Sequence, residues 1–303
     1  MQNWTTIQEK LLQGDTRSIA RAISLVENEA AGYAGFLQQL PAGSTPVIGI
    51  TGAPGAGKST LVDALLAELV GKGKKVAVLC VDPSSPFNLG ALLGDRIRMS
   101  QWYDHPNVYI RSLATRGSLG GLHPKIIEIT ELLKTAGFDY IIVETVGVGQ
   151  SEIEIAGLAD VTVVVLVPEA GDEIQTMKAG LMEIADVFVV NKSDRPEADL
   201  FVSNLRLMLA PAYSHASIEI PVVKTVAASQ QGIAELLEAI EKRLELEQEP
   251  QRKAWLLTER AWQLIQQEKM KGLKKEVLKE EIAGLLQSGS VNLYQYIQSK
   301  LWN

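Results

Sequence analysis

The sequence predicts an α/β fold built on a mostly parallel central sheet, and three observations carry this prediction. Short apolar, β-branched runs alternate with helical stretches between about residues 46 and 247. Hairpin turn signals do not join these runs, and parallel strands need longer crossovers that are usually helical. A glycine-rich loop stands directly between the first run and the helix after it. Together they predict the architecture of a P-loop NTPase, with helices on both faces of the sheet.

In chain order, a helical start is followed by a sheet domain and a helical end. Residues 1–45 carry apolar residues at helical spacing, and the breaker cluster PAGSTP closes this N-terminal extension. Residues 46–247 are expected to form the sheet domain, and residues 248–303, which lack strand signals, a C-terminal helical segment. The expected strands are 47–50, 76–81, 108–110, 140–143, 161–167, 187–190 and 222–226.

Composition excludes several classes of function. The 303 residues include 29 Lys and Arg against 36 Asp and Glu, and the formal net charge of −7 argues against a broad nucleic-acid-binding surface. The longest apolar run, 161–167, is far shorter than the ~20 residues that span a bilayer, and the first residues lack the pattern of a secretory signal. The one cysteine, Cys80, fits a reduced compartment. We expect a cytoplasmic protein without nucleic-acid or membrane partners.

The segment GAPGAGKST is a phosphate-binding loop in the required context, after the strand VIGIT and before the helix TLVDALLAELV. Its glycines let backbone N–H groups turn inward and, with the helix N-terminus, hold phosphate oxygens. Lys58 can reach the β- and γ-phosphates, and the Ser59 hydroxyl suits Mg²⁺. The predicted nucleotide-binding residues here are Gly52, Ala53, Pro54, Gly55, Ala56, Gly57, Lys58, Ser59 and Thr60.

The segment NKSD favours guanine over adenine as the base. It follows an apolar run, so it lies where a strand ends, on the ligand-binding edge of an open α/β sheet. Asp194 can accept hydrogen bonds from guanine N1–H and its exocyclic amine, which adenine does not offer in that arrangement. The stem of Lys192 can cover the base while Asn191 braces the loop. The loop after the next strand, with backbone N–H groups suited to guanine O6, contains Ala227, Ala228 and Ser229.

Acidic residues at strand ends are candidates for a Mg²⁺ site with Ser59. Glu144 ends a strand and Gly147 follows it, at the place where GTPases commonly carry D-x-x-G. Asp82 ends another strand, and Asp95 follows in the same segment; either could contact Mg²⁺, its waters or the attacking water. The alternatives are a structural carboxylate for Glu144 and a turn or helix cap for the two aspartates.

A third segment, 168–186, is compatible with a further nucleotide-sensing loop, although an ordinary polar helix face would look the same. Its candidate residues are Asp172, Gln175 and Lys178. No residue stands out as a hydrolytic base, and none of the nearby arginines, including Arg116, carries a selective signal. We therefore expect slow intrinsic hydrolysis that a partner accelerates.

Together these segments resemble the MeaB-type GTPases, the methylmalonyl-CoA mutase-associated family formerly labelled lysine/arginine/ornithine transport ATPases. The resemblance runs over nearly the whole chain. The segments that carry it are ARAISLVEN, GAPGAGKST, VDPSSP, LGDRIRM, ATRGSLGGL, ETVGVGQSE, PEAGDEIQTMKAGLMEIAD and NKSD. It implies a homodimeric GTPase, bound to GTP or GDP and Mg²⁺, that assists a cobalamin-dependent acyl-CoA mutase. Such proteins gate adenosylcobalamin loading and protect or reactivate the mutase.

The resemblance also implies roles for individual residues. Asp82, Asp95 and Glu144 fall on the Mg²⁺ and catalytic carboxylate positions. Asp172, Gln175 and Lys178 fall on a partner-responsive switch, with Lys178 implicated in hydrolysis alongside Lys58 and Asp95. The C-terminal segment would serve dimerisation. The chain departs from the family pattern in the guanine loop, which has Ala-Ala in place of the usual Ser-Ala.

Three other classes of function are alternatives. A metal-insertion GTPase for nickel enzymes would need clustered His and Cys ligands, whereas the three histidines here, His105, His123 and His215, are widely spaced. A nucleotide-gated binding module with incidental hydrolysis would rescue its partner equally well with GTP and with a non-hydrolysable analogue. A transport-coupled protein kinase is less favoured because a kinase signature set is lacking.

Overall fold

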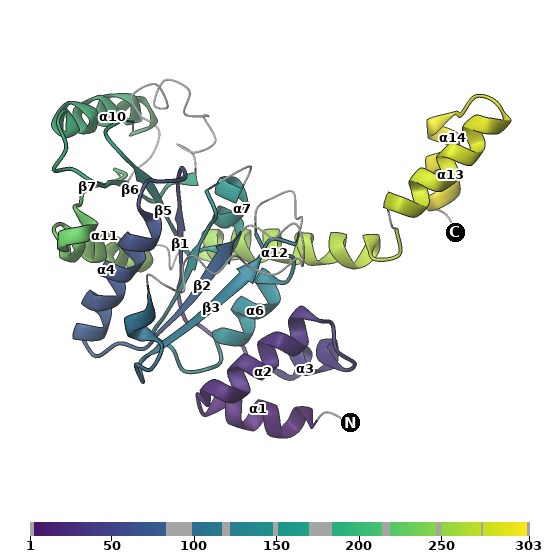
Figure 1. The fold of residues 1–303 in the computed structure, drawn as a ribbon, viewed down its shortest axis with the longest axis horizontal. Coiled ribbons are helices and arrows are strands. Elements are labelled where there is room, and N and C mark those ends of the chain that lie inside the picture. The colour runs from purple at the N-terminus through teal and green to yellow at the C-terminus, as the bar shows by residue number, and fades with distance from the viewer. Residues whose placement is uncertain are drawn as a thin grey trace. The chain divides into compact units, whose positions relative to one another are not determined.

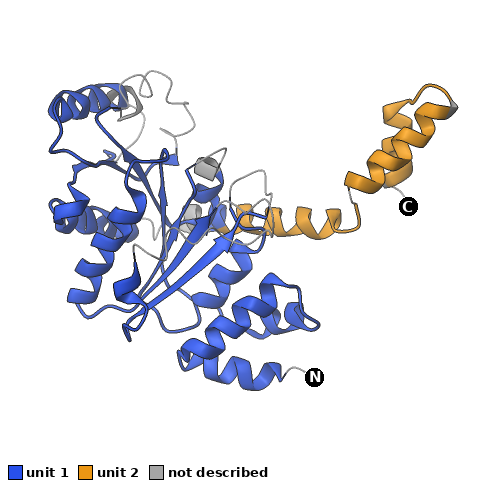
Figure 2. Cartoon of the chain, viewed as in Figure 1, with its two compact units in different colours: residues 1–256 blue, residues 257–303 orange. Residues whose placement is uncertain are grey.

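The computed structural model describes residues 3–82, 99–116, 122–147, 151–169, 184–213, 219–246, 250–273 and 275–301. The chain forms two compact units, residues 1–256 and residues 257–303 (Figure 2). The first unit contains the N-terminal helices and the sheet, and the boundary between the units falls inside helix α12 (Pro250–Met270).

A seven-stranded sheet forms the centre of the first unit, in the order β3-β2-β4-β1-β5-β6-β7 (Figure 1). Every neighbouring pair is parallel, which confirms the predicted fold class. The strands are β1 (Val47–Thr51), β2 (Val76–Asp82), β3 (Val108–Ala114), β4 (Tyr140–Glu144), β5 (Val161–Leu166), β6 (Val187–Val190) and β7 (Val222–Lys224). Strands β1, β2, β5 and β6 are buried throughout, as a parallel sheet covered on both faces requires.

All the expected strands are present: one has the predicted bounds, four differ from them by a single residue at one end, and β3 and β7 differ by more. β3 continues to Ala114 because it pairs with β2 along its full length, through the polar residues Arg111 and Ser112 that hide it from an apolar pattern. β7 stops at Lys224 because Val226 pairs instead with Gln231 in an antiparallel bridge.

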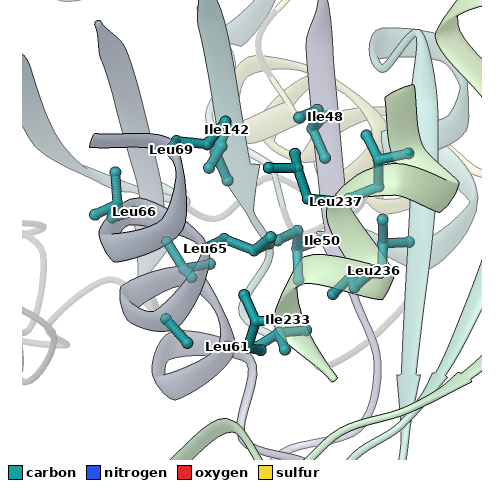
Figure 3. Packing of buried hydrophobic residues seen from close by; sticks show 14 of the residues in the cluster. Ile48, Ile50, Leu61, Leu65, Leu66, Leu69, Ile142, Ile233, Leu236 and Leu237 are labelled. Carbon is teal, nitrogen blue, oxygen red and sulfur yellow. The ribbon is translucent and has the colours of Figure 1, made fainter. Parts of the chain in front are cut away.

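Helices cover the two faces of the sheet. On one face, α4 (Lys58–Gly71) and α11 (Ile233–Leu246) pack against Ile48 and Ile50 of β1, and Figure 3 shows their leucine side chains interleaved over these strands. Because side chains alternate along a strand, Gly49 faces the other way, toward α7 (Ser151–Leu158). A Cβ on Gly49 would lie 2.5 Å from Ile155 Cγ1, so glycine here allows α7 to pack closely.

A second cluster covers β5 and β6 with α10 (Ala198–Tyr213), through Phe188, Phe201 and Leu205 among others. Among the described residues of the sheet domain, α6 (Ile126–Leu133) and the short turns η1 (Ser100–Trp102) and η2 (Ala227–Ser229) are also helical. η1 precedes the amino end of β3, whereas η2 follows β7 at the carboxyl edge of the sheet, where a ligand of an open α/β sheet binds.

The N-terminal residues form three helices: α1 (Trp4–Leu12), α2 (Thr16–Glu27) and α3 (Tyr33–Gln39). Asp15 caps α2, because its carboxylate accepts a hydrogen bond from Ser18 N at 2.8 Å. The apolar stripe of α2 is buried, and α2 lies beside α6 in Figure 1. Amphipathic spacing therefore attaches these helices to the sheet domain.

The second unit comprises the end of α12 with α13 (Lys275–Ser288) and α14 (Leu293–Leu301). Within it, Glu281 accepts a hydrogen bond from Tyr296 Oη at 2.7 Å and pairs with Lys300 at 2.6 Å. Several large apolar side chains are exposed, including Trp262 at 59% and Tyr294 at 81%. Within the described ranges, the helices are all too short or too polar to cross a membrane.

Candidate functional site

The phosphate-binding loop leaves the carboxyl end of β1 and enters α4 at Lys58. Gly57, directly before α4, has φ of +90°, and a Cβ there would lie 2.5 Å from Asn191 Nδ2. Only glycine meets both conditions without strain. The ammonium of Lys58 donates to Gly52 O at 2.8 Å and to Ala53 O at 3.1 Å, so it lies over the loop backbone.

Two buried carboxylates lie at the strand ends next to this loop. The Ser59 hydroxyl donates to Glu144 Oε1 at 2.7 Å, and both residues are buried. Glu144 ends β4, which lies between β1 and β2, and Asp82, also buried, ends β2. The strand order therefore brings Ser59, Glu144 and Asp82 to adjacent positions along one edge. Hydroxyl and carboxylate oxygens are the protein ligands that Mg²⁺ prefers.

The segment after β4 lies directly against the phosphate-binding loop. Thr145 N donates to Ile50 O at 3.0 Å, and its hydroxyl is 2.9 Å from that of Thr51. Gly147 has φ of +82°, and a Cβ on it would lie 2.4 Å from both Gly52 O and Lys58 Nζ. The sequence pattern had singled out Gly147 but not the two threonines, whose pairing across strands has no local signal.

Asn191 joins three segments of the site. Its Nδ2 donates to Ala56 O at 2.9 Å in the phosphate-binding loop. Its Oδ1 accepts from Thr225 Oγ1 and from Ala227 N, each at 3.1 Å, after β7. Lys192, with φ of +56°, adds a bond from its ammonium to Gly55 O at 2.7 Å. The amide of Asn191 therefore holds the NKSD loop, the phosphate-binding loop and the loop after β7 together.

The rest of the NKSD loop is open to a ligand. Ser193 N donates to Thr225 O at 3.1 Å, and Arg195 N to Lys192 O at 3.1 Å, so the turn around Asp194 is fixed by its backbone. Asp194 itself is exposed. Ala228 and Ser229 are exposed in η2, whereas Ala227 is buried. Sequence reasoning missed Thr225, which carries no signature apart from standing before that loop.

Some of the predicted residues cannot be placed. Asp95 lies outside the described residues, and so do Asp172, Gln175 and Lys178. Arg116 is described: its guanidinium donates to Glu27 O at 3.1 Å, on the N-terminal helices. In the described part of the chain, no three His, Cys, Asp or Glu side chains gather as a metal-binding group. His123, one of the three widely spaced histidines, is buried beside Glu27.

Comparisons with known proteins identify relatives. The family described as Methylmalonyl Co-A mutase-associated GTPase MeaB matches residues 19–281. A Pyrococcus horikoshii protein named as a GTPase is 46% identical over 247 residues, which are 80% of this chain and 78% of the relative. GTPase ArgK of Escherichia coli is 41% identical over 203 residues, 64% of this chain and 61% of that protein.

Comparison with solved structures also finds relatives. The crystal structure of LAO/AO transport system kinase has a TM-score of 0.66 and 27% identity, and the match covers 96% of this chain and 88% of that one. HypB from Helicobacter pylori in complex with nickel matches with a TM-score of 0.50 and 19% identity, over 67% of this chain and 89% of that one, and shows the fold alone. With the phosphate-binding loop and sheet in place, the chain belongs to the MeaB family and is a P-loop GTPase, an enzyme that binds guanine nucleotide and hydrolyses GTP.

Proposed function

We propose that this GTPase is a chaperone for a cobalamin-dependent acyl-CoA mutase, and that it gates cofactor loading and protects or reactivates the mutase. The matching family is described by its association with methylmalonyl-CoA mutase. A Caenorhabditis elegans protein named methylmalonic aciduria type A homolog is 48% identical over 148 residues, 48% of this chain and 37% of that protein. The observation that carries the nucleotide-binding part is the Asn191 amide, which joins the phosphate and base loops.

In this proposal the phosphate-binding loop holds the triphosphate through its backbone N–H groups, and Lys58 moves from the loop carbonyls to the β- and γ-phosphates. Asp194 accepts the two donors of guanine, because it is exposed at the end of a turn that its backbone fixes. Backbone N–H groups of η2 contact guanine O6. The small side chains at Ala227 and Ala228 leave that backbone accessible.

Mg²⁺ fits the oxygen donors at the strand ends. Ser59, Asp82 and Glu144 would hold the ion directly or through its waters, since the strand order gathers a hydroxyl and two buried carboxylates next to the phosphate loop. When bound, Mg²⁺ neutralises charge on the phosphate oxygens. The Ser59–Glu144 hydrogen bond fixes the hydroxyl toward that position.

Hydrolysis is proposed to use Lys58, Asp95 and Lys178, and Asp172 with Gln175 is proposed to sense the partner. For the four of these residues that lie outside the described ranges, the support is the family resemblance. We expect slow turnover by the protein alone and faster turnover with the mutase, because a GTPase without an arginine finger in cis depends on its partner for stabilisation of the transition state.

Residues 248–303 are proposed as the segment that forms a homodimer. The exposed apolar side chains of the second unit support this proposal, because aromatic and aliphatic residues that face water in a monomer are typical of interfaces. The exposed large side chains there are Leu257, Trp262, Ile265, Met270, Val277, Leu285, Leu286, Leu293, Tyr294 and Ile297. A second copy of the chain is the proposed occupant, and light scattering on the full chain tests it: a monomer at micromolar concentration would contradict it. We also propose a cytoplasmic location, as expected from the sequence.

The chaperone proposal is tested with methylmalonyl-CoA mutase that has been inactivated during turnover. Recovery of mutase activity is measured with this protein and adenosylcobalamin, in the presence of GTP, a non-hydrolysable GTP analogue or GDP. We expect recovery with GTP and much less with the analogue. Equal recovery with GTP and the analogue would favour a nucleotide-gated binding module. The absence of recovery, together with no effect of the mutase on GTP hydrolysis, would contradict the proposal for this mutase.

A further inference from the structure

The carboxyl end of α2 places a buried acid against the sheet domain. The Glu27 side chain is 9% exposed and pairs with Arg111 of β3, whose guanidinium also donates to the Ser24 hydroxyl at 3.1 Å. Two more bases face it: His123 Nε2 lies 3.7 Å from Glu27 Oε1, and Arg116 Nη2 lies 3.9 Å from the same oxygen. Arg116 Nη1 also donates to Glu27 O. We call Glu27, Arg111, Arg116 and His123 the Glu27 cluster.

The partners of Glu27 belong to two segments of the sheet domain. Arg111 and Arg116 come from β3 and the residues after it, and His123 precedes α6. Next to the cluster, Lys125 pairs with Glu29 at 2.8 Å and with Glu128 at 3.0 Å. One end of the N-terminal helices therefore holds both stretches through charged contacts, in which the Glu27 side chain is nearly buried and that of Arg116 is half-exposed.

Arg116 connects this cluster to the nucleotide edge. Its neighbour Thr115 donates its N–H to Asp82 O at 3.0 Å, next to the last pair of β2 and β3, which is Asp82 with Ala114. Arg116 has φ of +47°, a left-handed conformation that is unfavourable for a residue with a side chain and persists only where contacts hold it. Its contacts with Glu27 are such a restraint. A chain of bonds thus runs from Glu27 through Arg116 and Thr115 to Asp82.

We propose that Glu27 is a positioning residue for GTP hydrolysis, holding Arg116 and, through Thr115, the end of β2 that carries Asp82. The N-terminal helices are then part of the support of the Mg²⁺ side of the site. The inference goes beyond the chaperone function, and it rests on the proposed role of Asp82 toward Mg²⁺. Glu27 itself touches neither nucleotide nor metal.

The test compares full-length E27Q with the wild type. The amide keeps the size of the carboxylate but loses the charge that holds the bases. We expect kcat to fall about tenfold and the Mg²⁺ concentration for half-maximal hydrolysis to rise by a similar factor, the scale of coupling through packed networks. GDP affinity without Mg²⁺ should stay within about twofold, because the base and phosphate loops lie on other strands. The matched control is E131Q on α6, where an exposed glutamate pairs with Lys134; it should match the wild type.

A second variant tests the path even if E27Q folds poorly. R116Q removes a half-exposed side chain and should reproduce the change in Mg²⁺ dependence, and E27Q/R116Q should be no worse than either single variant, because both break the same chain of contacts. Additive effects, an unchanged Mg²⁺ dependence in R116Q, or faster hydrolysis in E27Q would overturn the inference. So would a fall in melting temperature in E27Q with kcat unchanged.

D82N separates the two proposals. If D82N raises the Mg²⁺ requirement and neither E27Q nor R116Q does, the inference about Glu27 fails while the proposed Mg²⁺ site stands. If D82N leaves the Mg²⁺ requirement unchanged, the proposed role of Asp82 fails and the inference fails with it.

Discussion

The two sides of the nucleotide edge are held in different ways. On the base side, after β6 and β7, the contacts around Asn191 are neutral hydrogen bonds between an amide, a hydroxyl and backbone groups. On the metal side, after β2, β3 and β4, the contacts involve buried carboxylates and the Glu27 cluster. Neutral networks change little with pH or ionic conditions, whereas buried charges respond to protons and ions. From this comparison we expect the geometry of the base side to change little with pH and ionic conditions, and that of the metal side to respond to both.

The largest effect is expected at Lys58, in the phosphate-binding loop between the base side and the metal side. K58A removes the cation proposed to meet the β- and γ-phosphates, and kcat should fall by about a thousandfold, the scale of losing a major transition-state stabiliser. Single-turnover hydrolysis of GTP measures this. K72A, which removes the exposed partner of Glu68 directly after the same helix, should leave the rate unchanged. A K58A enzyme that keeps more than a tenth of the rate would show that Lys58 mainly orders the loop.

The metal side should lose stability in acid. Burial, with the charges of Arg116, Arg111 and Lys125, lowers the pKa of His123 to about 4 from its usual 6.5. The unfolded chain therefore binds this proton first, so stability is full above pH 6.5 and falls as the pH drops toward 4. The shift corresponds to at most about 3 kcal/mol of unfolding free energy.

Urea unfolding at several pH values measures this contribution. Lys125 N donates to His123 Nδ1 at 3.0 Å, which leaves Nε2 to carry the proton that faces Glu27. H123N can keep an acceptor for Lys125 N but cannot titrate. Its stability should therefore fall less between pH 6.5 and 4 than that of the wild type, and an identical pH profile would exclude His123 as the source.

The base side is expected to control which nucleotide binds. D194N replaces the acceptor of two guanine donors with an amide, and GTP affinity should fall by about a hundredfold because a polar contact is left mismatched. Xanthosine triphosphate, which carries a carbonyl in place of the exocyclic amine, should gain affinity. Competition binding measures both, with D199N, at an exposed aspartate on α10, as the control. Unchanged discrimination between the two nucleotides would remove Asp194 from the base contacts.

The smallest effect is expected at the contact between Thr51, at the end of β1, and Thr145, directly after β4. T51V leaves the buried hydroxyl of Thr145 without its 2.9 Å partner, at a cost of about 1 kcal/mol or slightly more in unfolding free energy. T51V/T145V removes both hydroxyls and should recover most of that loss, since two apolar groups of similar shape can pack together. Denaturant unfolding at neutral pH measures the cycle. A double variant as unstable as the sum of the single variants would show that the hydroxyls have separate roles.

Local patterns predicted the sheet well because parallel strands are buried on both faces, so their apolar runs are visible in the sequence. They predicted the positions of the phosphate and NKSD loops because glycine and strand context define such loops. They did not predict the contacts that tie the site together. The Thr51–Thr145 pair and the Glu27–Arg116 contact join residues that are far apart in the chain, and nothing in either local sequence indicates its partner. β3 shows the same limit of sequence reasoning. Pairing with β2, and not an apolar sequence, extends this strand past Arg111.

The amide of Asn191 also has a thermodynamic consequence. Because one side chain contacts both the phosphate-binding loop and the loop after β7 that is proposed to hold the base, we expect that occupation of either proposed subsite reduces the freedom of the other. Guanosine and tripolyphosphate should therefore bind with positive cooperativity: the affinity for each should be higher when the other is already bound. The free energy of binding GTP then contains a linkage contribution that neither fragment supplies alone.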